Sequence, residues 1–88
     1  MIYWHKFPEE INMAPNAEGV YILGDADQTP VYVGRSDNLY ERLSEHPDPS
    51  NSCLQRKNIK YFAFEETDNS EERERELIEE HDPECNRT

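Results

Sequence analysis

Two tyrosines in this chain each lie two residues from a glycine, in triplets that mirror each other. The triplets are Gly19-Val20-Tyr21 and Tyr32-Val33-Gly34, and the 88 residues contain only three glycines. Side chains alternate across a strand with period two, so each glycine shares a face with its own tyrosine. If the two strands pair, we expect a shallow hollow floored by backbone with two hydroxyl groups at its edge. Taken alone, each triplet fits better with a strand end beside an ordinary packing tyrosine, and it is the pairing of the triplets and the residues downstream that favour a site.

Two further groups that could do chemistry follow the second triplet. Arg42 and His46 are four residues apart on a helix that we expect over 36–46, so they share one face of it. On a later helix, Leu77 and Ile78 are the only aliphatic residues, and counting back one turn places Glu74 on the same inward stripe. A carboxylate on the buried side of a helix is costly unless an arginine or a metal ion meets it. The alternative is that this carboxylate is one more solvated glutamate in a run of them.

The elements that must position these groups are short. The pattern predicts a hairpin of strands 18–23 and 30–34, followed by a helix over 36–46 that is capped by Ser36 or Asp37. A loop over 47–52 and a short helical piece around 52–57 come next. The last two elements are a strand over 58–66, covered on both faces, and a helix over 68–81 capped by Asn69 or Ser70. The first 17 residues contain two prolines, and Trp4 and Phe7 are the expected anchors. We therefore expect an α+β fold, with helices on a three-stranded sheet. Residues 1–88 form one domain in this interpretation, with the motifs in 17–88 and an irregular extension in 1–16.

The net charge of −11 is unevenly distributed along the chain. Residues 1–34, 35–60 and 61–88 carry −4, +1 and −8, and the middle segment holds five of the nine basic residues. So acidic a chain ordinarily excludes a nucleic-acid partner, because phosphate binding depends on Lys and Arg. The middle segment is either a small anion-binding face or simply the least acidic third. Three lysines against twenty acidic residues also resemble the composition of proteins from high-salt organisms.

The expected compartment follows mainly from features that the sequence lacks. We expect a cytoplasmic protein, because the chain has neither an apolar run long enough to span a membrane nor a signal-like start. In that setting Cys53 and Cys85 are predicted to be free thiols rather than one bridge. A zinc site built from these cysteines with His46 or His81 is the least favoured alternative, because no Cys-x-x-Cys pair is present.

Taken together, the motifs resemble the GIY-YIG nuclease family. The motifs occur in the family's order over about residues 17–88. They are GVY, followed eleven residues later by YVG, then Arg35, then DNLYERLSEH, and finally E-x-x-L-I with P-x-x-N behind it. The family includes the N-terminal nuclease of the bacterial excision-repair incision subunit, intron homing endonucleases and some restriction enzymes. The resemblance implies a DNA endonuclease that uses one divalent cation, Mg²⁺ or Mn²⁺, with a repair or recombination role as one expectation.

The resemblance also implies roles for individual residues. Glu74 would be the metal ligand, because carboxylate oxygen suits magnesium, and Arg42 would bind the phosphate with two donors. Tyr21 is the first choice to accept a proton from water with Tyr32 as its partner, although the reverse assignment stays open, and His46 would relay that proton or protonate the leaving oxygen. An ordinary phenol titrates near ~10, so the basic tyrosine needs a cation beside it, either Arg35 or the metal. The residues expected to contact substrate are Gly34, Arg35 and Asn86.

Three features depart from the family's pattern. Arg35 stands where many relatives have lysine, and an arginine cannot give up a proton. The acidic C-terminal third would repel a duplex, and the 88 residues include no second DNA-reading module. We therefore expect weak DNA binding by the domain alone and targeting by a protein partner or by DNA structure. The alternative function is a non-catalytic module that binds protein or DNA.

Overall fold

The computed structural model of the chain describes residues 2–46 and 51–87. Its elements, in chain order, are β1 (His5–Lys6), η1 (Ile11–Met13), β2 (Gly19–Gly24), β3 (Pro30–Ser36), α1 (Leu39–Ser44), α2 (Ser52–Arg56), β4 (Tyr61–Glu66), α3 (Ser70–His81) and η2 (Glu84–Asn86). The predicted loop over 47–52 falls mainly on residues outside this description.

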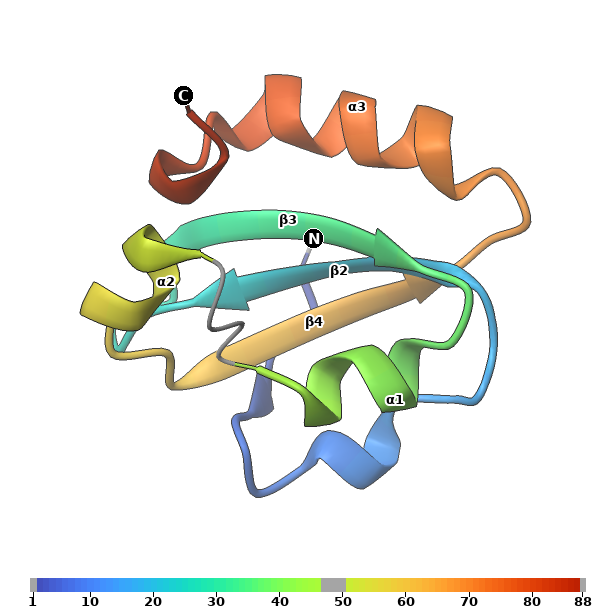
Figure 1. The fold of residues 1–88 in the computed structure, drawn as a ribbon, viewed down its shortest axis with the longest axis horizontal. Helices are drawn as coiled ribbons and strands as arrows, with labels where there is room; N and C mark the ends of the chain where they lie inside the picture. The colour runs from blue at the N-terminus through green and yellow to red at the C-terminus, as the bar shows by residue number, and fades with distance from the viewer. Residues whose placement is uncertain (1, 47–50, 88) are drawn as a thin grey trace.

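The sheet has four strands in the order β1-β4-β2-β3, and every neighbouring pair is antiparallel (Figure 1). The predicted hairpin is confirmed as β2 and β3, and the predicted third strand is β4. The sheet has one strand more than the predicted three, because His5 and Lys6 pair with Phe62 and Tyr61. A strand of two residues is too short to give a period-two pattern, so the sequence contains no signal for it.

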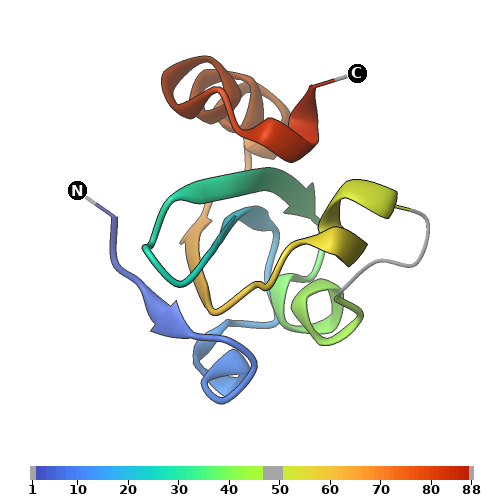
Figure 2. The ribbon, with the colours of Figure 1, turned by 90° about the vertical axis from the view of Figure 1, so that its left-hand side faces the viewer.

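The two faces of the sheet carry separate apolar clusters. The first cluster lies between the sheet and α1, α2 and η1, and its buried members include Tyr21, Leu23, Leu39, Leu43, Leu54 and Phe62. The second lies under α3 and consists of Val20, Ile22, Val33, Ala63 and Leu77. Figure 2 shows α3 over one side of the sheet, with α1 and α2 on the other. Strand β2 is buried along its whole length because both clusters cover it.

The helix boundaries are set by local caps. Asn38 rather than Ser36 or Asp37 caps α1, because its side chain accepts a hydrogen bond from the Glu41 amide at 3.0 Å. The Ser36 hydroxyl instead accepts from the Asn38 amide at the end of β3. Helix α3 follows Asn69, as predicted, and ends at Asp82 in the left-handed conformation (φ 44°). The predicted helix 36–46 is therefore shorter at both ends.

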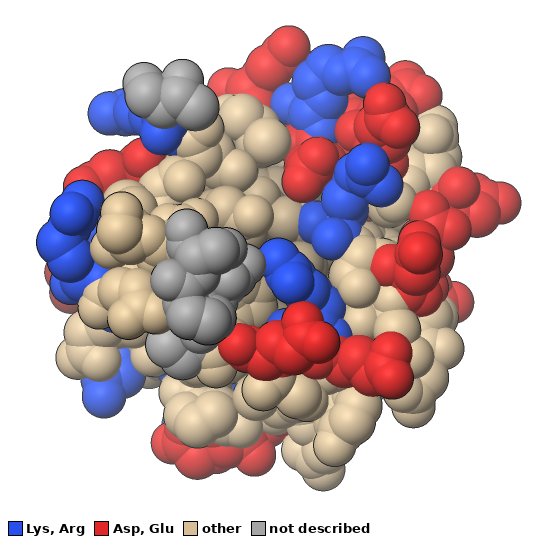
Figure 3. Space-filling view, viewed as in Figure 1, with Lys and Arg blue, Asp and Glu red and all other residues tan. Residues whose placement is uncertain are grey.

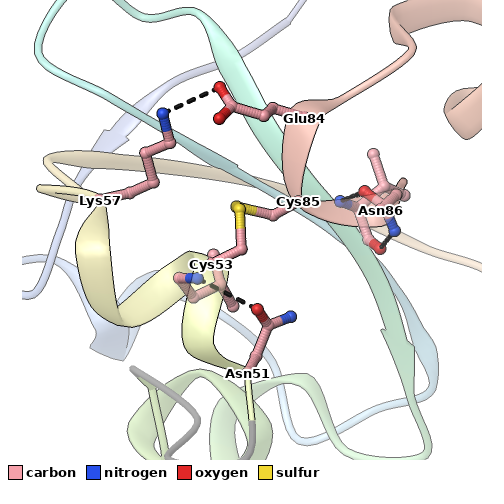
Figure 4. Close-up of a disulfide and its surroundings, with 8 residues drawn as sticks. Asn51, Cys53, Lys57, Glu84, Cys85 and Asn86 are labelled. Atoms are coloured by element: carbon pink, nitrogen blue, oxygen red, sulfur yellow. Dashed lines mark hydrogen bonds and ion pairs between the residues drawn. A yellow bond between two sulfur atoms is a disulfide. The ribbon is translucent and has the colours of Figure 1, made fainter. Parts of the chain in front are cut away.

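The two cysteines form a disulfide, so the prediction of free thiols was wrong (Figure 4). Residue 53 on α2 and residue 85 on η2 have Cα atoms 5.4 Å apart, within the usual range for a bridge. The sequence separation of 32 residues gave no indication of this proximity. The bridge also overturns the zinc alternative, because both sulfurs are bonded to each other. Within the described ranges, no helix is long and apolar enough to cross a membrane.

Candidate functional site

Gly34 lies directly opposite Tyr21 in the β2–β3 ladder. A Cβ atom at residue 34 would overlap the phenol ring and hydroxyl of Tyr21, so only glycine fits there. A Cβ at Gly19 would lie 2.7 Å from the Leu39 side chain and would meet the Glu65 carbonyl oxygen. The predicted shallow hollow is therefore absent at these two positions: one glycine makes room for the tyrosine of the other strand, and the other lets α1 approach the sheet.

The Tyr21 hydroxyl is the centre of a polar group on the α1 face of the sheet. Its oxygen lies 3.0 Å from Nε2 of His46 and accepts a hydrogen bond from Nε of Arg42 at 3.4 Å. Tyr32 completes the group, with its ring centroid 6.2 Å from that of Tyr21 and 6.3 Å from that of His46. Tyr21 is only 1% exposed, whereas Tyr32 is half-buried. Four of the predicted site residues therefore come together.

Arg42 also contacts an acidic side chain on its own helix. Its Nη1 donates to Oε1 of Glu45 at 3.3 Å, and 34% of the Arg42 side chain is exposed. The exposed guanidinium can therefore reach an anion from solvent, although the anion would compete with Glu45.

Glu74 faces the sheet side of α3, as the helical count predicted. Its side chain is 27% exposed, in contrast to the exposed glutamates at positions 71, 72 and 76. Oε1 lies 3.6 Å from Nε of Arg35 on β3. Burial raises the pKa of the Glu74 carboxyl, the Arg35 charge lowers it, and Glu71 raises it further, with a net upward shift. The buried carboxylate is therefore only partly compensated by Arg35, and a second cation nearby would stabilise its charge.

Asn86 uses both ends of its side-chain amide on the outer edge of β3. Its Oδ1 accepts from the Val33 amide at 2.7 Å, and its Nδ2 donates to the Val33 carbonyl at 2.9 Å. These two bonds satisfy backbone groups that an edge strand would otherwise leave unpaired. Asn86 thus holds the central residue of the Tyr32-Val33-Gly34 triplet, and its predicted contact with substrate stays a prediction.

Strand β3 connects the tyrosine group to the Glu74 group. Gly34 lies against the Tyr21 phenol, and the next residue, Arg35, reaches Glu74 on the opposite side of the sheet. Of the two cations, it is Arg42 rather than Arg35 for which a contact with the Tyr21 oxygen is found. On the face of the molecule seen in Figure 1, Lys and Arg atoms run across the middle of the surface and lie beside Asp and Glu atoms (Figure 3).

The donor set fits one hard cation better than a soft one. Glu74 supplies carboxylate oxygen, which suits Mg²⁺ or Mn²⁺ with water completing the shell. Over residues 2–46 and 51–87, no three His, Cys, Asp or Glu side chains cluster closely enough to form an all-protein metal site. The single half-buried carboxylate therefore fits one ion that keeps most of its water.

A cavity of about 200 Å³ lies elsewhere, between α3 and the sheet. Its lining includes Val20, Leu77 and His81, and none of the predicted site residues contributes to it. The predicted site residues therefore lie outside this cavity.

Sequence reasoning missed two contributors to this region. The disulfide joins Cys85, the residue before Asn86, to Cys53 of α2, and Glu45 pairs with Arg42 of α1. The i,i+3 spacing of Arg42 and Glu45 was a usable signal for the second. No local pattern could indicate the first.

Comparisons with known proteins show the family and the fold of this chain. The family model for the GIY-YIG catalytic domain matches residues 17–87. The chain is similar to the crystal structure of the GIY-YIG N-terminal endonuclease domain of UvrC from Thermotoga maritima bound to its catalytic divalent cation, magnesium. The TM-score is 0.73 at 26% identity, over 90% of this chain and 93% of that one.

Two point mutants of the same Thermotoga maritima domain, each with one tyrosine replaced by phenylalanine, give TM-scores of 0.66 at 22% identity. They cover 91% of this chain and 93% of theirs, and at that identity they show the fold alone. The α+β fold is thus the GIY-YIG fold. Comparison with curated proteins gives no match.

Proposed function

Because the chain belongs to the GIY-YIG catalytic domain family, we propose that it is a metal-dependent DNA endonuclease that hydrolyses phosphodiester bonds. The observation that carries the proposal is the contact of the Tyr21 hydroxyl with both Arg42 and His46. A buried phenol between a fixed cation and an imidazole is an arrangement suited to moving a proton next to a phosphate. Packing alone does not require these three polar groups to meet.

Glu74 would hold one Mg²⁺ or Mn²⁺ ion. The ion would neutralise charge on the phosphoryl oxygens and help to bind the substrate. The net upward shift in the Glu74 pKa supports this role, because a carboxylate that burial disfavours gains from a nearby cation. Nε of Arg35 lies 3.6 Å from Oε1 of Glu74, so this arginine would help to hold the Glu74 side chain in place until the ion binds.

The residues of the chain itself would share the remaining tasks. The exposed part of the Arg42 guanidinium would bind a phosphate oxygen, since its planar donors match that group. The Tyr21 hydroxyl lies 3.0 Å from Nε2 of His46 and would donate its proton there when that nitrogen is unprotonated. Tyr21 would accept a proton from the attacking water as it passes its own to His46, which would then protonate the leaving oxygen.

Tyr32 as the proton acceptor is a second assignment with one observation in its favour. Tyr32 is partly exposed, whereas Tyr21 is 1% exposed. A fluorinated tyrosine has a lower phenol pKa, so substituting it at each position in turn distinguishes the two. The acid limb of the pH–rate profile should move to lower pH only when the fluorinated residue is the general base.

Nicking of supercoiled plasmid with Mg²⁺ tests the proposed activity. Glu74→Gln should lower the rate by on the order of 100-fold or more, because one charged group at the transition state is lost. Glu76→Gln is the matched control: that carboxylate is exposed on the same helix and pairs with Arg73. Equal rates for the wild type and Glu74→Gln would refute the assignment of Glu74.

A non-catalytic binding module is the second candidate function. The observation in its favour is that both arginines of the region already contact carboxylates, Arg42 with Glu45 and Arg35 with Glu74. A folded wild-type protein that binds DNA or a protein but nicks nothing in Mg²⁺ or Mn²⁺ would support this function.

The wider role is also part of the proposal. Similarity to a UvrC nuclease domain supports a role in DNA repair. The acidity of the chain supports targeting by a protein partner, because the domain alone would attract DNA weakly. A cytoplasmic location stays a prediction from the sequence.

A further inference from the structure

The disulfide joins two elements that are too short to hold their own positions. Helix α2 has five residues and η2 has three, and helices of one or two turns are unstable without tertiary contacts. Besides the bridge, Lys57 after α2 donates to Glu84 in η2 at 2.8 Å (Figure 4). That ion pair is largely exposed, so it contributes little. The Cys53–Cys85 bond is therefore the strong link between these two elements.

Contacts lead from this bond directly into the candidate site. Asn86 follows Cys85 and holds both backbone groups of Val33 on the edge of β3. The neighbours of Val33 in the chain are Tyr32 and Gly34, and Gly34 lies against the Tyr21 phenol. A shift of η2 would therefore break the two bonds on the outer edge of β3, in the segment that carries the second tyrosine triplet and stays paired with β2 on its other edge.

We propose that the Cys53–Cys85 disulfide is a redox-sensitive clamp that holds Asn86 on β3 and thereby positions Tyr32 and Gly34 in the site. The two cysteines are positioning residues, since they act through Asn86 and Val33. The clamp itself is a property of the fold. Its effect on cleavage rests on the proposed function.

The two cysteine residues differ in exposure, so we expect reduction to begin at Cys53. Cys53 is half-buried, whereas Cys85 is 8% exposed. A thiolate of a dithiol reductant attacks Sγ of Cys53, the S–S bond breaks, and Cys85 leaves as a thiolate that takes up a proton. The second thiol of the reductant then attacks the mixed disulfide and releases Cys53 as a thiol. Two electrons pass from the dithiol, which becomes a disulfide, to the protein.

Amide hydrogen exchange of the full chain, oxidised or reduced with dithiothreitol, tests the clamp. Asn86 accepts the Val33 N–H, so reduction should speed exchange at Val33 by about tenfold or more. Exchange at Ile22, in the central strand β2, should change far less. The double variant Cys53→Ser/Cys85→Ser should exchange like the reduced protein whatever the reductant. Lys57→Gln is the matched control, because it removes only the ion pair and should keep the full redox response.

Plasmid nicking by the same samples adds the functional readout. Reduction should slow nicking by about tenfold in the wild type and in Lys57→Gln, and should not affect the double serine variant. Unchanged amide exchange at Val33 on reduction would overturn the clamp. An equal acceleration of exchange at Val33 and at Ile22 would also overturn it, because the disulfide would then stabilise the whole fold rather than the edge of β3. Because exchange is measured without DNA, it decides on the clamp even if the oxidised protein nicks nothing. Nicking that is unaffected by reduction while Val33 exchange accelerates would overturn the positioning role.

Discussion

At the scale of single residues, the proposed activity depends on how protons can be placed around the Tyr21 hydroxyl. Arg42 contributes only donors, so the hydroxyl oxygen must accept from it at 3.4 Å. The hydroxyl proton can then point to Nε2 of His46 at 3.0 Å. In the proposed mechanism, an unprotonated Nε2 of the imidazole would accept the proton that leaves the phenol.

Removing the hydroxyl is the direct test of this arrangement. Tyr21→Phe should lower the nicking rate by about 100-fold or more, because the proton path is lost. It should lower the free energy of unfolding by only about 0.5–1.5 kcal/mol, as expected for buried hydrogen bonds. The matched control is Tyr40→Phe, at a 40% exposed tyrosine on α1. Similar losses of activity in both variants would contradict the assigned role, and urea unfolding measures the stability term.

Gly34 gives a second test that removes no chemical group. An alanine there would overlap the Tyr21 ring, so the ring or strand β3 must shift. We expect Gly34→Ala to lower the free energy of unfolding by about 1–3 kcal/mol and to reduce nicking strongly. Thermal unfolding and the plasmid assay check both effects. Wild-type stability and activity in this variant would show that the phenol does not need the space.

The residue types were easier to predict than their partners. Counting along the helix correctly placed Glu74 on the inward side of α3, because one face of a helix follows from its period. The contact of Gly34 with Tyr21 on the neighbouring strand was not foreseen, because alternation within one strand is visible in the sequence but register between strands is not. For the same reason, the contact of Arg42 rather than Arg35 with the Tyr21 hydroxyl could not be foreseen.

At the scale of elements, the patterned segments were predicted, and the elements of only two or three residues were not. Strands β2, β3 and β4 and helix α3 follow from β-branched and aromatic runs and from caps. Strand β1 and helix η2 have two and three residues, and tertiary contacts hold them in place. The disulfide depends on the packing of α2 against η2, which no spacing of cysteines specifies.

Unfolding in urea tests the contribution of the disulfide at this scale. The bridge closes a loop of sequence separation 32, which in the chain-entropy estimate is equivalent to about 3–4 kcal/mol. The Cys53→Ser/Cys85→Ser variant should lose about this much, and Lys57→Gln much less. Equal stability of the double variant and the oxidised wild type would show that the bond does not constrain the unfolded chain.

At the scale of the whole molecule, charge is the dominant feature. A net charge of −11 on 88 residues, with −8 in the last 28, produces self-repulsion in the folded state. Helix α3 carries much of it, with exposed glutamates beside the half-buried Glu74. The excess of acidic residues is evident from the sequence, but its cause is not. It could be an adaptation to a saline environment, or it could belong to an enzyme that a partner protein brings to its DNA.

Salt should therefore stabilise this protein. Raising NaCl from about 0.05 M to about 1 M screens the repulsion. We expect the melting temperature to rise by about 4–8 °C, equivalent to about 1 kcal/mol. The Glu79→Gln/Glu80→Gln variant, which removes two exposed charges from α3, should show a smaller rise in calorimetry. A melting temperature that falls with salt would mean that net attraction, rather than repulsion, dominates among the charges.

Binding of Mn²⁺ observed by NMR tests most directly whether one cation binds beside Glu74 at the β3 edge. The paramagnetic ion should broaden the signals of Glu74 and Arg35 first, because broadening falls steeply with distance from the ion. Glu74→Gln should abolish this pattern, while Glu76→Gln on the same helix should keep it. Broadening that survives in Glu74→Gln, or that centres on the exposed glutamates of α3, would contradict the site described here.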